Sequence, residues 1–457
     1  GQILELEITD IAFGGRGLAR VDGLAVFVEP AVPGDRVRVR ITRKKKSYAE
    51  ARVLEMLEAS DDRLDPPCPY SGICGGCKWQ FLDYERQVEY KRRHVRESLE
   101  HIGGIHNPVV HPTICSPRRF GYRNKVEFSC TDRRWLLPAE LGQQGHDTGF
   151  ALGLHVHGNF YNVLDLHACL LQPEDGNTIL EAARRSIRTS TRPPYGLRTH
   201  EGFWRFLVLR HSVAGACWLV NLVTAEEDLT AVRAVAEDLT AAWPRFAVVV
   251  NNITARKAAV AVGEREVHLA GRQTLTEQID SYRFRISANS FFQTNTEAAR
   301  LLYRTVRDYA TLEGTERVLD LYSGTGTIPI LLADRAREVV GLEIEPTAEE
   351  DALGNCRRNG ISNCRFVAGE IRETLPALEF RPEVVVIDPP RDGMHKDVVR
   401  QVSELGAARI VYVSCNPATL ARDLAILTER YRLLEVQPVD MFPHTFHIES
   451  VARLEAR

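Results

Sequence analysis

Five short apolar runs in the last third of the chain constrain its fold more than any other feature. These runs are RVLDLY, EVVGLE, RFVAGE, EVVVID and RIVYVS, and the stretches between them carry apolar residues at helical spacing. Strands that are buried on both faces read as nearly continuous apolar runs, and intervening helices imply parallel pairing. A closing pair of runs, YRLLEVQPVD and HIESVARLEAR, has no helix between its members and predicts an antiparallel hairpin. The sequence therefore predicts an α/β domain with a mainly parallel sheet.

Changes of pattern along the 457 residues predict three domains, because a single core rarely grows beyond about 250 to 300 residues. Residues 1–59 contain short alternating strands with glycine turns, which are typical of a small barrel. Residues 60–288 are mainly strand-like, apart from a charged stretch at 83–101 whose apolar residues have helical spacing. Residues 289–457 form the α/β domain.

The composition excludes a disordered chain and indicates no membrane segment. Hydrophobic residues make up 44% of the chain and charged residues 26%, without a low-complexity tract. No apolar run approaches the roughly 20 residues that span a bilayer, and the first residues lack a basic region followed by a long apolar one. We therefore expect a cytoplasmic protein without a membrane partner.

The net charge of -3 does not by itself indicate a protein that binds polyanions. Basic residues are concentrated in two N-terminal stretches, at 36–46 and 86–125. A run of charge is more often a solvated face than a binding surface, so the charge pattern alone leaves nucleic-acid binding open.

Acidic residues and glycines follow two of the apolar runs. Asp320 ends the first run and is followed by Gly324 and Gly326, where glycine lets the backbone approach a bound nucleoside closely. A dinucleotide site would also fit a glycine pair, but Pro329 replaces the third glycine of that fingerprint. Glu343 ends the second run and is the acid expected to accept hydrogen bonds from ribose hydroxyls. These residues predict a site for an adenosine-type cofactor.

Two later runs end in reactive side chains, Asp388 in IDPPR and Cys415 in VSCNPATLARD. Ligands of open α/β sheets sit at the carboxyl ends of the strands, so we expect these two side chains to converge on one cleft with Asp320 and Glu343. A lone cysteine is more often a small buried hydrophobe. Cys415 differs because Pro417 predicts a helix just beyond it, where the helix dipole would lower the pKa of the thiol.

Six segments together resemble the RNA uridine-5-methyltransferases of the RumA/TrmA type. In chain order they are SANSFFQTN, LDLYSGTGT, GLE, IDPPR, SCNPATLARD and HIESVARL. The resemblance implies that S-adenosylmethionine is the cofactor, that Cys415 is the nucleophile and that Glu449 is the general base. The resemblance also implies six side chains that contact the cofactor, in addition to Gly324 of the glycine turn. The predicted cofactor site therefore consists of Gln293, Tyr322, Gly324, Thr327, Glu343, Glu370 and Asp388. Glu370 is placed only by its distance from Glu343, where an aspartate or asparagine is more usual.

The chemistry of uracil explains why such an enzyme needs a thiolate. Carbon 5 is a poor nucleophile, and addition of a thiolate to carbon 6 makes an enolate whose negative charge reaches carbon 5, so that carbon 5 can displace the methyl group from the sulfonium. A base must afterwards remove the proton from carbon 5 so that the thiol can leave, and such a base typically contributes about 10² to 10⁴ in rate. Glu449 takes this role by the resemblance, although an acid in a terminal strand is more often on the surface.

The N-terminal half resembles the subgroup of this family that carries two further features. Residues 1–59 are similar to a TRAM domain, a small barrel that binds RNA. This resemblance implies that the basic residues at 36–46 contact RNA. The second feature is CPYSGICGGCKWQ, in which Cys68, Cys74 and Cys77 have the spacing C-x5-C-x2-C. This tight spacing predicts a metal site, and both zinc and an iron–sulfur cluster would need a fourth ligand.

The resemblance supplies Cys169, in LDLHACLLQP, as the fourth ligand of a 4Fe-4S cluster. Radical S-adenosylmethionine enzymes use the different spacing C-x3-C-x2-C and leave one iron open. A fully ligated cluster therefore implies a structural or RNA-positioning role. The other cysteines match no motif and are expected to be packing residues: Cys115, Cys130, Cys217, Cys356 and Cys364.

A uridine in a folded RNA must be extruded before a thiolate can reach it, at a cost of a few kcal/mol. Phe291 and Phe292 are candidates to stack on the base, which returns about 1 to 3 kcal/mol, although core packing is an equally good interpretation. The resemblance also implies that residues 81–112 pack with the C-terminal domain. The candidate RNA contacts are Arg123, Asn124, Lys125, Phe291 and Asn295.

These observations lead us to expect a monomer that methylates a uridine in ribosomal RNA, 23S in particular, because the transfer-RNA branch often lacks the barrel and the cysteines. The same reaction on transfer RNA is the alternative. A non-catalytic iron–sulfur protein that binds RNA would not need Cys415, Asp388 and Glu449. Methylation of an exocyclic amine would predict N-P-P-Y or D-P-P-Y at Asp388, whereas the sequence has D-P-P-R.

Overall fold

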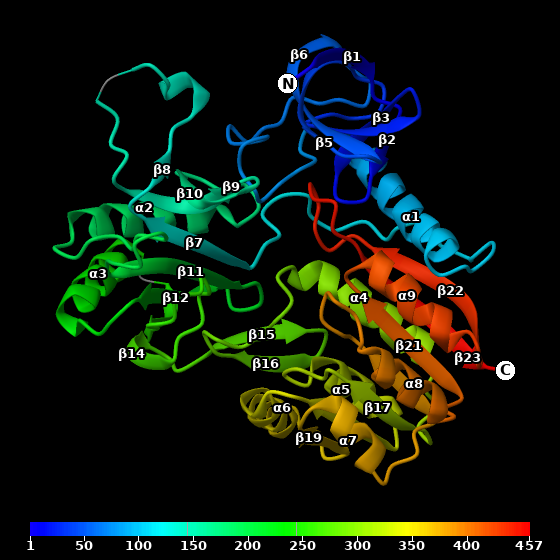
Figure 1. The fold of residues 1–457 in the computed structure, drawn as a ribbon. Coiled ribbons are helices and arrows are strands. Elements are labelled where there is room, and N and C mark those ends of the chain that lie inside the picture. The colour runs from blue at the N-terminus through cyan, green and yellow to red at the C-terminus, as the bar shows by residue number, and fades with distance from the viewer. Residues whose placement is uncertain (144, 244) are drawn as a thin grey trace.

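The computed structural model describes residues 1–143, 145–243 and 245–457, which fold into three parts (Figure 1). The N-terminal part is a strongly curved six-stranded sheet with the order β1-β5-β6-β4-β3-β2. Its alternating burial explains the curvature, because apolar side chains such as Val37 and Val39 point into a small core. The bounds of its strands are β1 Ile3–Glu7, β2 Asp10–Ala12, β3 Arg16–Val21, β4 Leu24–Glu29, β5 Arg36–Lys44 and β6 Tyr48–Glu58.

Part of the basic 36–46 stretch is neutralised within this barrel. Arg36 pairs with Glu58 at 3.0 Å, and Arg38 pairs with Glu5 at 2.9 Å and also contacts Glu55. The charge that remains available to a polyanion is therefore smaller than the sequence suggests.

The central part is an eight-stranded sheet with the order β14-β13-β12-β11-β7-β9-β10-β8. Two helices, α2 (Glu174–Thr189) and α3 (Leu229–Ala242), pack against each other and against this sheet. A short 3-10 turn, η1, spans Pro138–Glu140. The strands are β7 Lys125–Thr131, β8 Arg134–Trp135, β9 Ala151–Val156, β10 Asn159–Asp165, β11 Trp204–Ser212, β12 Cys217–Thr224, β13 Phe246–Ile253 and β14 Arg265–Gly271.

The C-terminal part confirms the predicted α/β domain. Its seven-stranded sheet has the order β19-β18-β17-β20-β21-β23-β22, in which the first five strands are parallel and the last two form the predicted antiparallel hairpin. The strands are β17 Arg317–Leu321, β18 Glu338–Glu343, β19 Cys364–Ala368, β20 Val384–Ile387, β21 Arg409–Ser414, β22 Tyr431–Val439 and β23 Glu449–Ala456.

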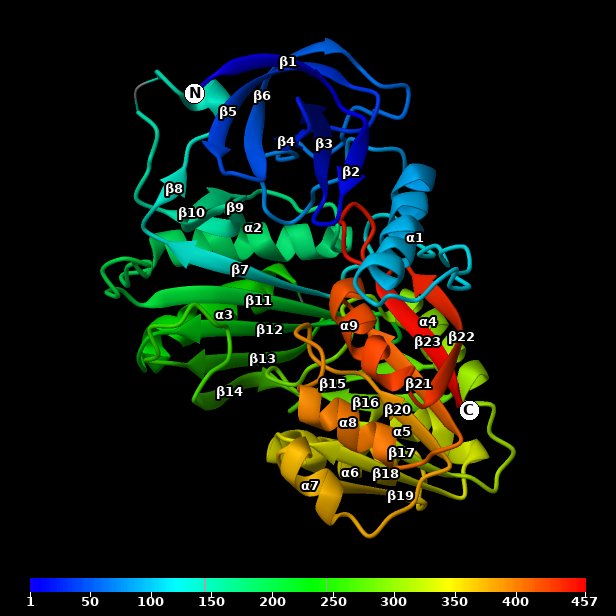
Figure 2. The same cartoon turned by 45° about the vertical axis from the view of Figure 1, so that its right-hand side comes forward.

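Helices cover both faces of this sheet, as its apolar strands require. Neighbouring strand residues point to opposite faces, so Val318 belongs to the core under α4, α5 and α6, and Leu319 to the core under α7, α8 and α9. Figure 2 shows α8 and α9 lying together on the second face. The bounds are α4 Thr296–Ala310, α5 Thr327–Leu332, η2 Ala333–Arg335, α6 Pro346–Arg358, α7 Ile371–Ala377, α8 Lys396–Glu404 and α9 Pro417–Leu427.

The predicted helix after residue 83 is α1 (Tyr84–His101), which Asp83 caps by accepting a hydrogen bond from the Glu85 backbone. It packs against α9 and β22 rather than against the central sheet. A fully buried ion pair of 2.6 Å between Lys91 and Asp440 fixes this contact. In the described part of the chain, no helix is long and apolar enough to cross a bilayer.

A hairpin joins the central and C-terminal parts, formed by β15 (Leu275–Ile279) and β16 (Tyr282–Ile286). It packs on α6, where the Arg285 backbone donates a hydrogen bond to the Asn355 side chain at 2.7 Å. The C-terminal part therefore recruits residues upstream of the expected boundary at residue 289.

Candidate active site at the strand ends

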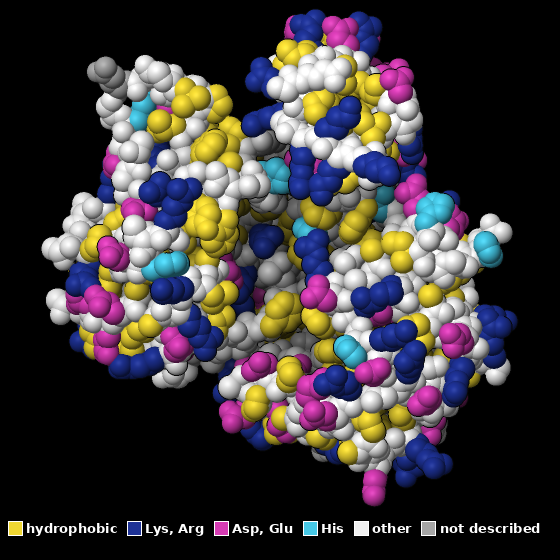
Figure 3. All heavy atoms as spheres, viewed as in Figure 1, with side chains coloured by type: hydrophobic (Ala, Val, Ile, Leu, Met, Phe, Trp, Pro, Cys, Tyr) yellow, Lys and Arg dark blue, Asp and Glu magenta, His cyan; other side chains and the backbone are white. Residues whose placement is uncertain are grey.

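A cleft of about 1400 Å³ lies between the central and C-terminal parts. The space-filling view shows the molecule hollowed between its lobes (Figure 3). One wall comes from the carboxyl ends of β17, β18, β20 and β21 and from the start of β23, as expected for an open α/β sheet. The predicted site residues that line the cleft are Arg123, Phe291, Gln293, Tyr322, Gly324, Glu343, Asp388, Cys415 and Glu449.

Cys415 and Glu449 reach the cleft from two paired strands. The last paired residues of the antiparallel strands β21 and β23 are Ser414 and Ser450. Cys415 follows Ser414 and Glu449 precedes Ser450, so the two stand at opposite positions of the same strand pair. Directly opposite residues of antiparallel strands share a face. A sulfur nucleophile and a carboxyl group are thus brought together on one wall.

The expected helix start beyond Cys415 is confirmed, but the expected fall in the thiol pKa is wrong. α9 begins at Pro417, and the Asn416 side chain caps it by accepting from the Ala418 backbone at 3.1 Å. Burial nevertheless raises the pKa of Cys415 to about 12, and the nearby Glu449 carboxyl adds to the rise. Desolvation of the thiolate outweighs the helix dipole because the dipole contributes only a fraction of a charge.

Three carboxyl groups lie close together near this wall, of which Asp320 and Glu449 are buried and Asp388 is half-buried. Burial raises the pKa of Asp388 to about 7, and burial followed by the charge of Asp388 raises the pKa of Glu449 well above its ordinary value. The pKa of Asp320 is also raised well above its ordinary value, first by burial. Asp320 does not line the cleft as predicted, because it lies inside β17 with both carboxyl oxygens buried.

The turn after β17 is shaped for close approach to a ligand. Gly324 has a φ of 53°, a left-handed conformation that costs glycine little, and its N–H donates to the Glu343 carboxylate at 2.8 Å. The other Glu343 oxygen accepts from the Ile344 and Glu345 backbones at 2.8 and 3.1 Å. Tyr322 has a φ of 67°, which is strained for a residue with a side chain and is typical of functional sites.

Two of the predicted cofactor contacts do not line the cleft. Thr327 is the first residue of α5 and is only 8% exposed. Glu370 precedes α7, is exposed and pairs with Arg372 at 3.5 Å. Its charge contributes to raising the pKa of Tyr322, so the two residues are near each other. Contacts of Thr327 and Glu370 with the cofactor stay predictions.

The two phenylalanines proposed for base stacking have different environments. Phe291 is 69% exposed and lines the cleft, whereas Phe292 is 5% exposed and belongs to the hydrophobic core. Of the pair, only Phe291 is free to stack on a base without rearrangement.

Two predicted RNA contacts, Asn124 and Asn295, are engaged inside the protein, and their contact with RNA stays a prediction. Asn124 is buried and donates to the Gln293 backbone at 2.9 Å and to the Thr296 hydroxyl at 2.8 Å. Asn295 is buried, caps α4 and donates to the Ser116 hydroxyl at 3.1 Å. The side-chain N–H donors of both amides are therefore used inside the protein, behind the cleft wall.

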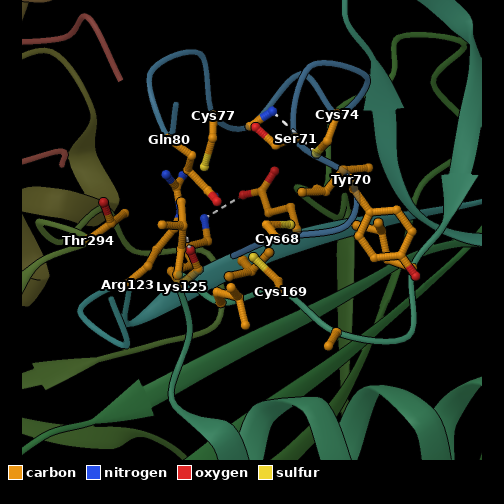
Figure 4. Close-up of a pocket in the computed structure, with 18 of the residues that line it drawn as sticks. Cys68, Tyr70, Ser71, Cys74, Cys77, Gln80, Arg123, Lys125, Cys169 and Thr294 are labelled. Carbon is orange, nitrogen blue, oxygen red and sulfur yellow. Dashed lines mark hydrogen bonds and ion pairs between the residues drawn. The ribbon is translucent and has the colours of Figure 1, made fainter. Parts of the chain in front are cut away.

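A second pocket of about 340 Å³ adjoins the cleft and contains the predicted cysteine ligands (Figure 4). Cys68, Cys74 and Cys77 reach it from the loop before α1, and Cys169 from the loop after β10. Burial raises the pKa of Cys74 and Cys77 to about 12. Over the described ranges, no three side chains of histidine, cysteine, aspartate or glutamate are arranged to hold one metal ion.

The cysteine pocket and the cleft share part of their walls. Gly76, Arg123, Phe291 and Thr294 line both. Lys125 lines the cysteine pocket only, where it pairs with Glu127 at 2.6 Å.

Comparison with known proteins places this site in a family. Residues 229–457 match the family model for tRNA (Uracil-5-)-methyltransferase, and residues 1–54 match the model for the TRAM domain. An RNA methyltransferase of Chlorobaculum tepidum is 44% identical over 100% of this chain and 96% of its own length. The chain belongs to the uracil-5 RNA methyltransferase family.

Two further relatives extend this similarity over the whole chain. An RNA methyltransferase of Bacteroides thetaiotaomicron is 40% identical over 98% of this chain and 100% of its own. The crystal structure of Pyrococcus abyssi tRNA (uracil-54, C5)-methyltransferase in complex with S-adenosyl-L-homocysteine superposes with a TM-score of 0.76 and 28% identity, covering 99% of this chain and 100% of that one. This uracil-5 methyltransferase therefore uses S-adenosylmethionine to methylate carbon 5 of uracil in RNA.

Sequence reasoning missed three residues of this uracil-5 methyltransferase site. Arg391 lines the cleft and its charge lowers the pKa of Cys415. Tyr303 is buried beside Gln293 and near the carboxyl groups of Asp388 and Glu449. His447 lines the cleft, and burial lowers its pKa to about 4, so its ring is neutral at pH 7. Arg391 lies in the IDPPR motif, so the sequence could have indicated it. Tyr303 and His447 belong to no motif and are recognised only from the tertiary structure.

Proposed function

We propose that Cys415 adds to carbon 6 of the target uridine and that Glu449 removes the proton from carbon 5. The observation that carries this proposal is their opposition across the ends of β21 and β23, at the cleft of a uracil-5 RNA methyltransferase. The resulting sulfur–carbon bond places negative charge on carbon 5, which can then accept the methyl group. Removal of the carbon 5 proton by Glu449 afterwards breaks the sulfur–carbon bond and releases the thiolate.

The protonation states of Cys415 and Glu449 determine when each group can act. Burial favours the thiol form of Cys415 in the free protein, so its proton must pass to solvent in the cleft before sulfur bonds to carbon 6, and the positive charge of Arg391 favours the thiolate. Burial also favours the protonated form of Glu449, so this carboxyl must release its own proton to the cleft before it can act. Once ionised, its raised pKa makes it a stronger base toward the carbon 5 proton.

The cofactor residues fit an adenosine-containing cation. Gly324 offers an approachable backbone, Glu343 a carboxylate fixed at the strand end, and Asp388 a half-buried acid that can ionise beside positive charge. S-adenosylmethionine, when bound, supplies the methyl group from a positively charged sulfur. We infer that Gln293 and Tyr322 complete this site.

The cysteine pocket fits a 4Fe-4S cluster better than a single ion. In such a cluster each cysteine binds a different iron, so the four sulfurs stand farther apart than ligands of one metal. Four free thiols from two separate loops line one pocket, and among the described residues no three of them are placed to hold a single ion. Because the pocket shares a wall with the cleft, ligation by Cys68, Cys74, Cys77 and Cys169 would hold Arg123 beside the RNA site.

We infer that the modified uridine lies in ribosomal RNA, of the 23S type. The support is the combination of a TRAM barrel and a cysteine segment, which adds RNA-binding surface beyond the catalytic domain. Transfer RNA is the second candidate, because the Pyrococcus abyssi transfer-RNA enzyme resembles 99% of this chain.

The deciding experiment transfers labelled methyl groups in vitro to ribosomal RNA and to transfer RNA from a strain that lacks the enzyme. Nucleoside digestion should find labelled 5-methyluridine in 23S ribosomal RNA and none with Cys415→Ala. Label confined to transfer RNA would establish the second candidate. Label in neither RNA would contradict both.

A further inference from the structure

A pocket of about 760 Å³ lies at the opposite end of the central sheet from the cleft. It forms where the starts of β12 and β13 and the end of β14 meet the β15–β16 hairpin and the end of α6. It shares no lining residue with the cleft or with the cysteine pocket in the described part of the chain. It is therefore a separate site.

Positive charge dominates this pocket. Four arginines line it, all of them exposed, and within the described residues no aspartate or glutamate does. They are Arg245, Arg272, Arg283 and Arg358.

The acid next to this pocket is already engaged. Glu277 is 1% exposed and accepts hydrogen bonds from the Val213 and Ala214 backbones at 2.9 and 3.1 Å. It therefore offers no oxygen to the arginines. By contrast Arg285, close to Arg283 on β16, is neutralised by Asp351 at 3.0 Å.

This arrangement favours an anion with several negative groups. Guanidinium groups are weakly hydrated and bind phosphate oxygens through two parallel hydrogen bonds, which makes arginine the preferred side chain for phosphate recognition. Four of them without a carboxylate partner repel one another until a polyanion enters. The chain carries a net charge of -3, so its affinity for RNA must come from such local clusters.

The position of the pocket matches an RNA that extends beyond the target nucleotide. Thr347 near the start of α6 lines the cleft, and Arg358 at its end lines the arginine pocket. At the rise of an α-helix these two residues are about 17 Å apart along the axis. A folded RNA with its uridine in the cleft can span that distance, whereas a single nucleotide cannot.

We propose that this arginine pocket binds backbone phosphates of the substrate RNA at a point remote from the methylated uridine. The proposal rests on RNA being the substrate, and it is independent of the roles given to Cys415 and Glu449. Phosphate contacts position an RNA without reading its sequence. The pocket would therefore set the register of a large RNA on the enzyme.

The test measures RNA affinity as a function of salt for the full-length protein. The variant carries Arg272→Gln, Arg283→Gln and Arg358→Gln, and the probes are unmethylated 23S ribosomal RNA, bulk transfer RNA and a short oligouridylate. With whichever long RNA is methylated, the slope of log affinity against log salt should become shallower by roughly one unit per arginine that contacts phosphate. The oligouridylate, which cannot reach the pocket, should bind both proteins equally.

A matched control replaces exposed arginines remote from both sites, with Arg233→Gln, Arg381→Gln and Arg400→Gln. This control carries the same change of charge and should keep the wild-type slope. In methylation assays the pocket variant should raise KM for the long RNA and leave kcat unchanged. Loss of kcat with an unchanged slope, or equal slopes for all three proteins, would overturn the proposal.

A third measurement separates RNA from small anions. Inorganic phosphate should compete only weakly, because a single phosphate group engages few of the four guanidinium groups. If phosphate bound tightly to the wild type and not to the pocket variant, while RNA affinity was the same for both, the pocket would be a small-anion site and the proposal would be wrong.

Discussion

Glu449 stands across from Cys415, one position beyond the Ser414–Ser450 pair that ends the ladder between β21 and β23. The register of a terminal hairpin therefore determines which carboxyl group faces the nucleophile. A slip of one residue would turn Glu449 to the other face of the sheet. The hairpin thus contributes to the active site as well as to the edge of the sheet.

Cys415→Ala should abolish formation of 5-methyluridine, because no other sulfur lines the described cleft. Cys115→Ala is the matched control, since Cys115 is exposed and outside the cleft, and it should retain full activity. Mass spectrometry of digested RNA measures both. Methylation by the Cys415→Ala protein would disprove the covalent mechanism.

Glu449→Gln should leave addition and methyl transfer possible but stop the loss of the carbon 5 proton. The expected result is a protein–RNA adduct that survives denaturing electrophoresis, with turnover lowered by about 10² to 10⁴. The adduct should disappear when Cys415→Ala is added to the same chain. An unchanged turnover would assign the base to another residue.

The affinity for S-adenosylmethionine should rise with pH from about 6 to 8. The pKa of Asp388 is raised to about 7 by burial, so below that pH the acid is mostly protonated and cannot favour a cation. Ionisation on binding releases a proton, and the gain per pH unit approaches tenfold below the pKa and fades above it. S-adenosylhomocysteine, whose sulfur is neutral, should show a flatter profile.

Calorimetry at several pH values compares the two ligands directly. Asp388→Asn should bind S-adenosylmethionine more weakly at pH 8 and remove the difference between the two profiles. Asp392→Asn, four residues along on the exposed surface, should change neither. Parallel profiles in the wild type would show that Asp388 does not sense the sulfonium charge.

Ligands of open α/β sheets bind at the carboxyl ends of the strands, and apolar runs in the sequence show where these strands end. This reasoning correctly predicted that Glu343, Asp388 and Cys415 line the cleft. It failed for Asp320, which lies one residue before the end of its strand and is sealed inside the sheet. The direction of the Cys415 pKa was also beyond sequence reasoning. It depends on burial and on Glu449, which the fold brings from the terminal hairpin.

The environment of side chains at domain junctions was also not predictable from the sequence. Asn124 and Asn295 lie among the residues predicted to contact RNA, yet both are buried and donate hydrogen bonds to neighbouring segments. The four arginines of the arginine pocket likewise come from separate places in the chain between Arg245 and Arg358, so no local sequence pattern predicts the pocket. Such features appear only when the packing of distant segments is known.

Lys91→Met should destabilise the folded protein by about 3 to 5 kcal/mol, because it leaves the Asp440 carboxylate buried without its cationic partner. Tyr84 still donates to Asp440 at 2.8 Å, which places the expected loss toward the lower end. Arg93→Ala on the same helix removes a partly exposed ion pair and should cost about 1 kcal/mol or less. Urea unfolding measures both, and equal effects would show that burial of the pair is unimportant.

Cys77→Ser should lower the bound iron and acid-labile sulfide of protein purified without oxygen, because a hydroxyl is a poor replacement for a thiolate ligand. The wild type should carry about four of each per chain. Cys115→Ser, at an exposed thiol outside the pocket, should leave the iron content unchanged. Since Gly76 and Arg123 line both pockets, loss of the cluster should also raise KM for RNA more than KM for S-adenosylmethionine. Wild-type protein with zinc in place of iron and sulfide would instead assign the four cysteines to a single-metal site.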